Sequence, residues 1–300
     1  MHSHILELNG VYQKYPAKKK KMRTILSDIN LQVSPGELVT VVGPTGCGKS
    51  TLLRLILGSE RPYQGSVKVN GAEVKEPARN RGIVFQQYSL FSNLTVRKNV
   101  MFGLELEYFS LPGRFFGFNK SKLKEFKEKA DEYLQRVGLL EHSEKYPHEL
   151  SGGMRQRAAI AQAMVMKPEI LLMDEPHGAL DMGTREEMQI FVLEQWKQEN
   201  LTVIFVTHDL EEAVFLGSRI VVLSQFYAGN TSSGGAKIVK DVPVGWELPR
   251  PTSIKHSKKF SEIMQSIRHE GLDPHFLQEI RDFDLRHNDS LSLNTTENWD

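Results

Sequence analysis

The 300-residue sequence contains a single cysteine, Cys47, and no apolar stretch of membrane-spanning length. A lone cysteine excludes an internal disulfide and a cysteine-rich zinc site, and such sparing use is typical of a reducing compartment. A membrane helix needs about 18 to 20 consecutive apolar residues, and the first ten residues, MHSHILELNG, lack the apolar core of a signal peptide. We therefore expect a soluble, cytosolic protein that needs a partner to hold it at any membrane.

The sequence also has almost no net charge. Its 38 Lys and Arg residues nearly balance 37 Asp and Glu residues, which leaves a net charge of +1. This balance argues against non-specific nucleic-acid binding as the main activity. A hydrophobic fraction of 40% with 25% charged residues is typical of globular proteins and excludes wholesale disorder or a fibrous repeat.

Short apolar strands alternate with helices along much of the chain, which predicts a parallel sheet covered on both faces. The expected strands lie at residues 4–15, 29–33, 38–42, 67–69, 170–173, 203–206 and 220–223. Residues 95–166 are instead predicted to be helical, because their apolar side chains recur at three- and four-residue steps. After the last of the expected strands, at 220–223, we expect a Gly/Ser-rich connection, a hairpin and a helix at 258–268.

A phosphate-binding loop is predicted directly after the expected strand at 38–42. Residues 43–50, Gly-Pro-Thr-Gly-Cys-Gly-Lys-Ser, match the pattern G-x-x-x-x-G-K-[ST] and open a helix. Glycines let successive backbone N–H groups and the helix N-terminus point at phosphate oxygens. Lys49 would place its charge on the β- and γ-phosphates, and Ser50 would offer its hydroxyl to Mg²⁺. The candidate nucleotide ligands of this loop are Gly43, Pro44, Thr45, Gly46, Cys47, Gly48, Lys49, Ser50 and Thr51.

Two adjacent carboxylates end another apolar run. Asp174 and Glu175 follow the residues at 170–173, and buried carboxylates are costly unless a cation or a proton-transfer role compensates them. We expect Asp174 to hold Mg²⁺, directly or through water, and Glu175 to polarise the attacking water as a general base. Alone, the pair would more often be two solvated acids, but the phosphate-binding loop favours the catalytic interpretation.

A second glycine-containing turn separates this sequence from other nucleotide-binding proteins. Residues 150–157, Leu-Ser-Gly-Gly-Met-Arg-Gln-Arg, precede an alanine-rich helix and resemble the signature motif of ATP-binding cassette (ABC) proteins. Ser151 with the amides of Gly152 and Gly153 would form another anion cradle at a helix N-terminus. In that family the signature of one subunit covers the ATP held by another. The resemblance therefore implies a head-to-tail dimer around two ATP molecules, and it argues against a kinase-like protein.

The remaining ABC motifs follow in the family's order. Tyr15 matches the aromatic residue that stacks on adenine, and Tyr12 is the alternative because spacing does not choose between them. Gln86 matches the glutamine that senses the γ-phosphate and Mg²⁺ and links to the membrane partner. Asp181 matches the loop that signals across the dimer. His208 matches the histidine that contacts the γ-phosphate and positions the catalytic water.

The resemblance covers about residues 4–225. It implies an α/β fold, a P-loop NTPase core with an N-terminal antiparallel β subdomain and an α-helical subdomain inserted at about 88–166. Residues 226–285 would form a C-terminal appendix of a hairpin and a helix, and residues 286–300 a disordered tail. Within the family, the stretches at 175–181, 184–189 and 207–213 are most similar to importer ATPases of the nitrate, sulfonate and taurine group.

Some positions depart from the pattern of this group. His177 stands where the group usually has Phe, and Gln162 replaces an arginine often found in the signature helix. Neither position touches phosphate in the family, so the expected ATP chemistry is unaffected. The segment at 105–124 is longer than usual and would form either a docking surface for a permease or a small core of its own. Its aromatic residues are Tyr108, Phe109, Phe115, Phe116 and Phe118.

The resemblance implies an ATPase that drives separate membrane permease subunits for a small solute, at the cytoplasmic face of the inner membrane. A second copy of the chain or a paralogous cassette would complete the ATP sites, a solute-binding protein would be an indirect partner, and no nucleic acid is expected. The alternatives are an exporter cassette and a non-transport ABC ATPase. Long coiled-coil insertions or two cassettes in one chain, usual in the non-transport class, are absent from this sequence.

Overall fold

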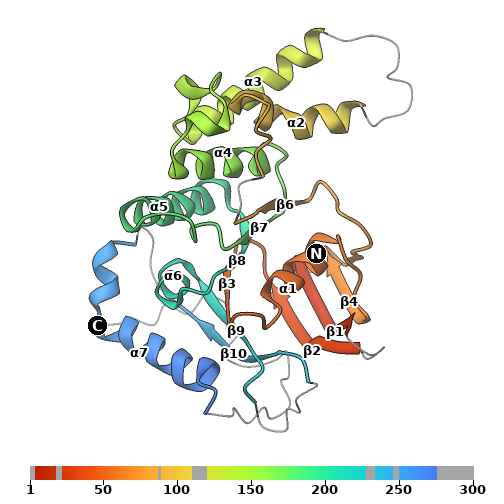
Figure 1. Cartoon of the computed structure of the whole chain (residues 1–300), viewed down its shortest axis with the longest axis vertical. Coiled ribbons are helices and arrows are strands. Elements are labelled where there is room, and N and C mark those ends of the chain that lie inside the picture. Colours follow the sequence, from red (N-terminus) through yellow and green to blue (C-terminus); the bar gives the residue numbers. More distant parts are fainter. Residues whose placement is uncertain are drawn as a thin grey trace. The chain divides into compact units, whose positions relative to one another are not determined.

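The computed structural model of the chain describes residues 4–17, 22–86, 89–109, 120–227, 234–245 and 250–275. It divides into two compact units (Figure 1). Unit 1 comprises residues 1–78 and 192–300, and unit 2 comprises residues 79–191. The described helices include none that is both long enough and apolar enough to cross a bilayer.

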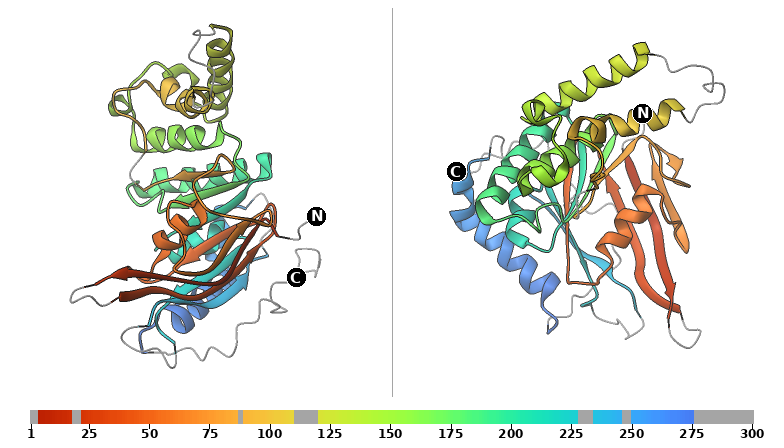
Figure 2. Two further views of the ribbon diagram at one scale, coloured as in Figure 1. Left: turned by 90° about the vertical axis from the view of Figure 1, so that its right-hand side faces the viewer. Right: turned by 45° about the horizontal axis from the view of Figure 1, so that its top comes forward.

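An antiparallel sheet forms the N-terminal part of unit 1, and its two long strands can be followed in Figure 2. Its strands are β1 (Leu6–Pro16), β2 (Met22–Val33), β4 (Gln64–Val69) and β5 (Ala72–Glu73), in the order β2-β1-β4-β5. In β1 the buried positions shift from Leu6 and Leu8 to Val11 and Gln13. Between them Gly10 has a φ of 55° and the register with β2 is irregular. This β-bulge keeps one face of the strand buried along its length.

A second set of strands in unit 1 is buried on both faces except at its edge strand, Lys237–Pro243. It consists of β3 (Leu38–Val42), β8 (Thr202–Val206), β9 (Arg219–Ser224) and β10 (Lys237–Pro243). Strands β8 and β9 run parallel to β3 on either side of it, and β10 runs antiparallel along β9. Every residue of β3 and β8 is buried, which explains why all but Thr40 and Thr202 are apolar.

The helices of unit 1 are α1 (Lys49–Leu57), α6 (Leu210–Leu216) and α7 (Lys258–Ile267). Helix α5 (Met182–Glu199) starts in unit 2, and its residues from Val192 onward belong to unit 1. Helix α7 packs against α6 and against the 3₁₀ turn Thr252–His256, and it continues into a π-helical turn, Arg268–Leu272. The described C-terminal residues therefore pack against α6, the helix between β8 and β9.

Unit 2 contains the predicted helical region between two paired strands. Strands β6 (Arg81–Val84) and β7 (Ile170–Asp174) are parallel, and the helices between them are α2 (Val96–Phe109), α3 (Lys120–Arg136) and α4 (Gly152–Met164). Helix α2 packs against both α3 and α4. Arg97 connects these elements, because its guanidinium donates to Asp131 at 2.5 Å and to Ser143 at 2.8 Å.

Most expected elements are present within one or two residues, but β2 begins at Met22, seven residues before the strand expected at 29–33, and β4 begins at Gln64, three residues before the one expected at 67–69. The strand at 81–84 was not predicted, and β10 makes one edge of the unit 1 strands antiparallel. Of the aromatic segment at 105–124, Tyr108 meets Phe126 edge to face with ring centroids 5.8 Å apart. Outside the described residues lie the four lysines at 18–21, the aromatic residues Phe115, Phe116 and Phe118, and the expected tail at 286–300.

Candidate functional site

The loop at 43–48 joins the end of β3 to the first residue of α1, as predicted. Gly46 and Gly48 have φ values of 79° and 105°, in the left-handed region that favours glycine. A Cβ atom on Gly43 would lie 2.1 Å from the carbonyl oxygen of Leu223, and one on Gly48 would lie 2.8 Å from side chains of β2. The backbone conformation and the close approach of neighbouring chain together require these glycines.

Lys49, the first residue of α1, is buried with 6% exposure. Its Nζ donates to the carbonyl oxygens of Gly43 at 2.8 Å and Pro44 at 3.2 Å. The ammonium group therefore lies within the curve of the loop, next to the positive end of the α1 dipole. A lysine ammonium has three donors and no acceptor, so an anion in the loop would compete with these carbonyl groups for it. The loop can hold a phosphate-sized anion.

Cys47 is buried with 2% exposure, and its sulfur would lie 2.7 Å from a Cβ atom on Gly43. Burial raises the pKa of this thiol, although the nearby charge of Lys49 acts in the opposite direction. A neutral, enclosed thiol is a poor nucleophile. The backbone N–H of Cys47 donates to the carbonyl oxygen of Pro44 at 3.2 Å, so this residue contributes its main chain to the loop.

His208 lies at the same edge of the unit 1 strands as the loop. Strands β3 and β8 are neighbours and parallel, with Val41 opposite Val206. The loop that begins at Gly43 and the exposed His208 therefore both follow the carboxyl ends of adjacent strands, which is where ligands bind in open α/β sheets. The strand geometry places the histidine beside the phosphate-binding loop.

Hydrogen bonds fix the backbone on both sides of His208. The hydroxyl of Thr207 donates to the buried carboxylate of Glu212 at 2.6 Å and accepts from the N–H of Asp209 at 3.0 Å. Asp209 is the N-cap of α6, and its carboxylate accepts from the N–H of Glu212 at 3.2 Å. This arrangement resembles a capping box, and the Thr-x-Asp-x-x-Glu spacing could have predicted it from the sequence.

The two candidate tyrosines lie on opposite faces of β1. Tyr15 continues the face of the buried Gln13, whereas Tyr12 belongs to the other face. Gln13 is paired with Leu26 on β2, and the side chain of Leu26 reaches Gly48 of the loop. Ile25, the neighbour of Leu26 on β2, reaches Gly48 at the same distance, so this part of the hairpin packs against the phosphate-binding loop.

Each tyrosine also has polar neighbours. The hydroxyl of Tyr15 donates to the carboxylate of Glu60, which accepts from the amide of Gln13 at 3.2 Å as well. Burial raises the pKa of Tyr12, and the negative charge of Asp28 raises it further. Tyr15 is thus held by its hydroxyl, which leaves its ring as the part available for stacking.

In unit 2, the predicted carboxylates end strand β7. Asp174 is the last residue of the strand, and Glu175 follows with a φ of 47°. A left-handed conformation costs a residue other than glycine about 1 to 2 kcal/mol, and such residues concentrate at functional sites. The backbone N–H of Gly178 donates to the carbonyl of Glu175 at 3.1 Å, which closes a tight turn after the strand.

Gln86 reaches the same turn from the neighbouring strand. Val84 of β6 is paired with Met173 of β7 in parallel register, so both strands end at one edge. A Cβ atom on Gly178 would lie 3.3 Å from the amide nitrogen of Gln86. Three oxygen-bearing side chains, Gln86, Asp174 and Glu175, therefore gather at this edge of unit 2.

The signature residues occupy the N-terminus of α4. Ser151 is the exposed N-cap, and its hydroxyl accepts from the N–H of Met154 at 3.3 Å. Gly152 is the first residue of the helix. A Cβ atom on Gly153 would lie 2.6 Å from the methyl group of Thr184, so glycine allows α4 to approach α5 closely. The helix presents an open N-terminal end to solvent.

Asp181 and His177 frame the start of α5. The exposed carboxylate of Asp181 accepts from the N–H of Thr184 at 3.0 Å. This bond, followed by one from the Thr184 hydroxyl, lowers the pKa of Asp181. His177, the departure from the family pattern, is buried with 1% exposure.

The structure thus places the predicted residues in two sets. Unit 1 brings together the loop at 43–50, His208 and the face of Tyr15, and unit 2 brings together Gln86, Asp174 and Glu175 and, separately, the signature helix end and Asp181. The left-handed conformation of Glu175 and the bonds that flank His208 were not predicted.

Comparisons with known proteins support the resemblance to ABC proteins that the sequence motifs indicate. The family model described as ABC transporter matches residues 26–178. The nitrate import ATP-binding protein NrtD of Synechocystis sp. is 46% identical over 224 residues, 75% of this chain and 78% of that protein. The aliphatic sulfonates import ATP-binding protein SsuB of Bacillus subtilis is 39% identical over 241 residues, 80% of this chain and 86% of that protein.

Solved structures show the same fold. A dimeric structure of MJ0796, a bacterial ABC transporter cassette, is 30% identical, covers 80% of this chain and 98% of its own, and has a TM-score of 0.64. A post-hydrolysis dimer of that cassette bound to ADP and Pi is 28% identical, with the same coverage and TM-score. The chain belongs to the ABC transporter family, and it is an ATPase with the α/β P-loop fold of the ATP-binding cassette.

Proposed function

We propose that this chain is the ATP-hydrolysing subunit of an importer and that it drives separate permease subunits in the membrane. The observation that carries the ATP site is Lys49, whose buried ammonium is held by loop carbonyl groups that an anion would replace. The names of the relatives NrtD and SsuB, both import ATP-binding proteins, support import over export.

The residues of the loop from Gly43 to Thr51 would surround the phosphates of ATP, and all of them except Pro44, which has no N–H group, could donate a backbone hydrogen bond. Lys49 would neutralise charge on the β- and γ-phosphates as the bond between them breaks. The ring of Tyr15 would stack on adenine, because Glu60 holds its hydroxyl and this part of the hairpin packs against the loop. His208 would donate to a γ-phosphate oxygen from the neighbouring strand end.

The donor set fits Mg²⁺. A hydroxyl (Ser50), a carboxylate (Asp174) and an amide oxygen (Gln86) are hard oxygen ligands, which Mg²⁺ prefers and which leave positions for water and phosphate. When bound, the ion would neutralise charge on the phosphate oxygens. Glu175 would hold the attacking water and accept its proton, while the left-handed backbone at this residue fixes where its carboxylate starts.

We propose that two copies, or this chain and a paralogous cassette, complete each ATP site. The exposed N-terminus of α4, with Ser151 and the amides of Gly152 and Gly153, suits the γ-phosphate of an ATP held by the other copy. Asp181 would contact the partner near the same place. The paired cassettes among the solved relatives support this arrangement. ATP would then close the pair, and hydrolysis would release it.

A groove in unit 2 suits the permease. It has a volume of about 770 Å³ and lies between α2 and α3, with apolar and charged residues in its walls. The apolar ones are Leu94, Met101, Phe102 and Leu123. The basic ones, Arg97, Lys98, Lys124 and Lys127, outnumber the acidic ones, Glu105 and Glu144. Phe91, close in sequence to Gln86, extends this surface, since its ring centroid lies 4.6 Å from that of Phe102. A short amphipathic helix with acidic side chains would fit it.

The central experiment measures Mg·ATP hydrolysis and self-association of the purified chain. Glu175→Gln keeps the side-chain shape but removes the base, so it should bind ATP, hydrolyse it at least about a hundredfold more slowly and elute as a dimer with ATP. Lys49→Ala should lose ATP binding and turnover. Normal hydrolysis by Lys49→Ala, or a Glu175→Gln variant that stays monomeric with ATP, would contradict the proposal.

The transport role has its own test. The chain should sediment with membranes when the permease genes are co-expressed and should remain in the supernatant without them. Lys98→Glu combined with Lys127→Glu reverses the charge of the groove and should abolish sedimentation while leaving ATP binding intact. Sedimentation that is indifferent to the permease would argue for the non-transport alternative.

A further inference from the structure

Arg250 is a buried cation in the C-terminal part of the chain. Its side chain is 6% exposed, and one guanidinium nitrogen, Nη1, donates to the carbonyl oxygens of Phe215 at 2.7 Å, Leu216 at 2.6 Å and Gly217 at 3.1 Å. The guanidinium carbon lies 5.7 Å from the ring centroid of Trp196. Burial lowers the pKa of Arg250 to about 10, so the folded chain bears a desolvation cost to keep this group here.

The three carbonyl groups belong to the C-terminal end of α6. A helix leaves its last carbonyls without intrahelical partners and carries partial negative charge there, so a cation at this end satisfies both needs. Helix α6 has only 7 residues, and its N-cap, Asp209, directly follows His208. Because α6 is short and rigid, a contact that fixes its C-terminal end also fixes the position of His208 at its N-terminal end.

Other contacts hold α6 along the same line. The hydroxyl of Thr40, on the strand that leads into the phosphate-binding loop, donates to the carbonyl of Ala213 at 3.1 Å. Lys255 pairs with Glu211 at 3.3 Å and lies 4.7 Å from the ring centroid of Phe215. Arg250 and Lys255, in the C-terminal part of the chain, therefore contact α6, and β3 contacts the same helix through Thr40.

We propose that Arg250 is a positioning residue for ATP hydrolysis, acting through α6 to hold His208 at the height of the γ-phosphate. This inference rests on the proposed role of His208. It gives the C-terminal residues a part in catalysis rather than in stability alone. Arg250 does not touch the nucleotide, so its loss should reduce kcat and leave ATP affinity, which the loop at 43–50 sets, unchanged.

The test is a double-mutant cycle on the full chain with Mg·ATP. Arg250→Met keeps an unbranched apolar stem and removes the donors, and it should lower kcat about tenfold with KM within about twofold. Arg250→Lys, whose ammonium still donates to carbonyl groups, should recover most of kcat. In a His208→Ala background, Arg250→Met should slow hydrolysis by less than about twofold, because both changes act on one group.

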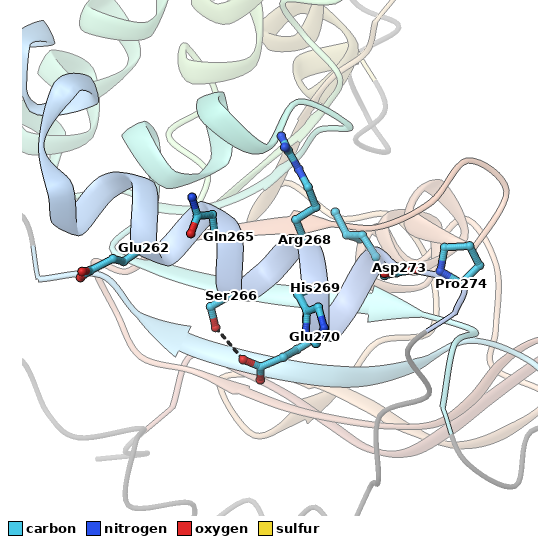
Figure 3. A pocket seen from close by; sticks show the side chains of 9 residues that line it. Glu262, Gln265, Ser266, Arg268, His269, Glu270, Asp273 and Pro274 are labelled. Carbon is cyan, nitrogen blue, oxygen red and sulfur yellow. Dashed lines mark hydrogen bonds between the residues drawn. The ribbon is translucent and has the colours of Figure 1, made fainter.

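The matched control is Lys240→Met. Lys240 donates to Ser266 and Glu270 at 2.6 Å each, and Ser266 donates to Glu270 at 2.9 Å (Figure 3). These bonds hold the same C-terminal region but do not reach α6, so this variant should lose thermal stability with kcat unchanged. Arg250→Gln, which keeps a neutral donor, replaces Arg250→Met if the latter does not fold, with kcat expected between those of the Met and Lys variants.

The outcomes separate the two hypotheses. If the wild-type chain does not hydrolyse Mg·ATP, the proposed function is wrong. If it does, and His208→Ala is slow, then equal kcat values for Arg250→Met and Lys240→Met overturn the positioning role. Fully additive effects of Arg250→Met and His208→Ala would also overturn it, since a general loss of structure acts independently of His208.

Discussion

The backbone at Glu175 allows stability and activity to be separated. Among the described residues, five other than glycine have a positive φ: Asp28, Asn70, Lys167, Glu175 and Asn200. Asp and Asn tolerate this conformation because their short polar side chains bond locally, so Lys167 and Glu175 are the two whose residue type opposes it. We predict that Glu175→Asn stabilises the protein while it abolishes hydrolysis.

The magnitude follows from the conformational preference. Relief of a left-handed conformation at a residue other than glycine is worth about 1 kcal/mol, and the shorter side chain at this half-buried position loses part of that. A gain of about 1 kcal/mol raises the melting temperature of a chain of this size by about 2 °C. Glu175→Gln retains the strain, so Glu175→Asn should melt about 1 to 2 °C above it.

Differential scanning calorimetry without nucleotide is the assay, because bound ATP would stabilise each variant by mass action. Lys167→Asn is the matched control. Lys167 has a φ of 51° and is exposed in the turn before β7, so the variant should gain about 2 °C with normal ATPase activity. If Lys167→Asn gains stability and Glu175→Asn melts at or below Glu175→Gln, the strain at Glu175 is not what the φ angle suggests.

Three further predictions concern single groups. Ser151→Arg should retain ATP binding by the isolated chain and block dimerisation in size-exclusion chromatography, and an unimpaired ATPase would refute a role in the partner's site. Cys47 should resist iodoacetamide at pH 8 until the chain unfolds, since burial raises the pKa of its thiol. Hydrogen bonding from Lys240 lowers the pKa of Glu270, so its stabilising effect is lost as pH falls through that lowered pKa; Lys240→Met should flatten the stability profile below pH 5.

The phosphate-binding loop could be predicted because its determinants are local. A buried strand at 38–42 with four apolar residues, followed by three glycines and a lysine, specifies a strand, a turn and a helix start within thirteen positions. Leu223, which is far away in sequence, also requires glycine at position 43, because its carbonyl oxygen would collide with a Cβ atom there. The loop pattern already specifies glycine at this position. Local and long-range requirements agree at this loop. The predicted order of strand, turn and helix is confirmed, and α1 begins within one residue of the expected position.

Strand β6 was missed because its sequence is half polar. Only Ile83 and Val84 of Arg81–Val84 are apolar, and Arg81 is nevertheless buried with 9% exposure. Its guanidinium donates to the side chain of Asn80 at 2.9 Å, and burial lowers the pKa of Arg81. A buried arginine breaks the apolar pattern on which strand prediction depends, so pairing with β7 decides the conformation.

The choice between Tyr12 and Tyr15 cannot be made from the alternation of side chains along a strand. Residues three apart on a strand face opposite sides, so the sequence alone indicates that only one of them can face the loop. Which one depends on the bulge at Gly10 and on the pairing of Gln13 with Leu26. That information lies in β2, so it enters only with the fold.

Arg250 could not have been assigned from the sequence at all. Its partners are the main-chain carbonyls of Phe215, Leu216 and Gly217, and every residue type carries such a group. The constraint is visible only at Gly217, where a Cβ atom would lie 2.6 Å from the Thr40 hydroxyl, so the segment that Arg250 binds cannot shift toward β3. Substitutions in α6 that preserve its backbone should therefore leave the bonds of Arg250 intact. A change at Gly217 should displace the carbonyls themselves and, if the positioning role holds, lower kcat as the loss of Arg250 does.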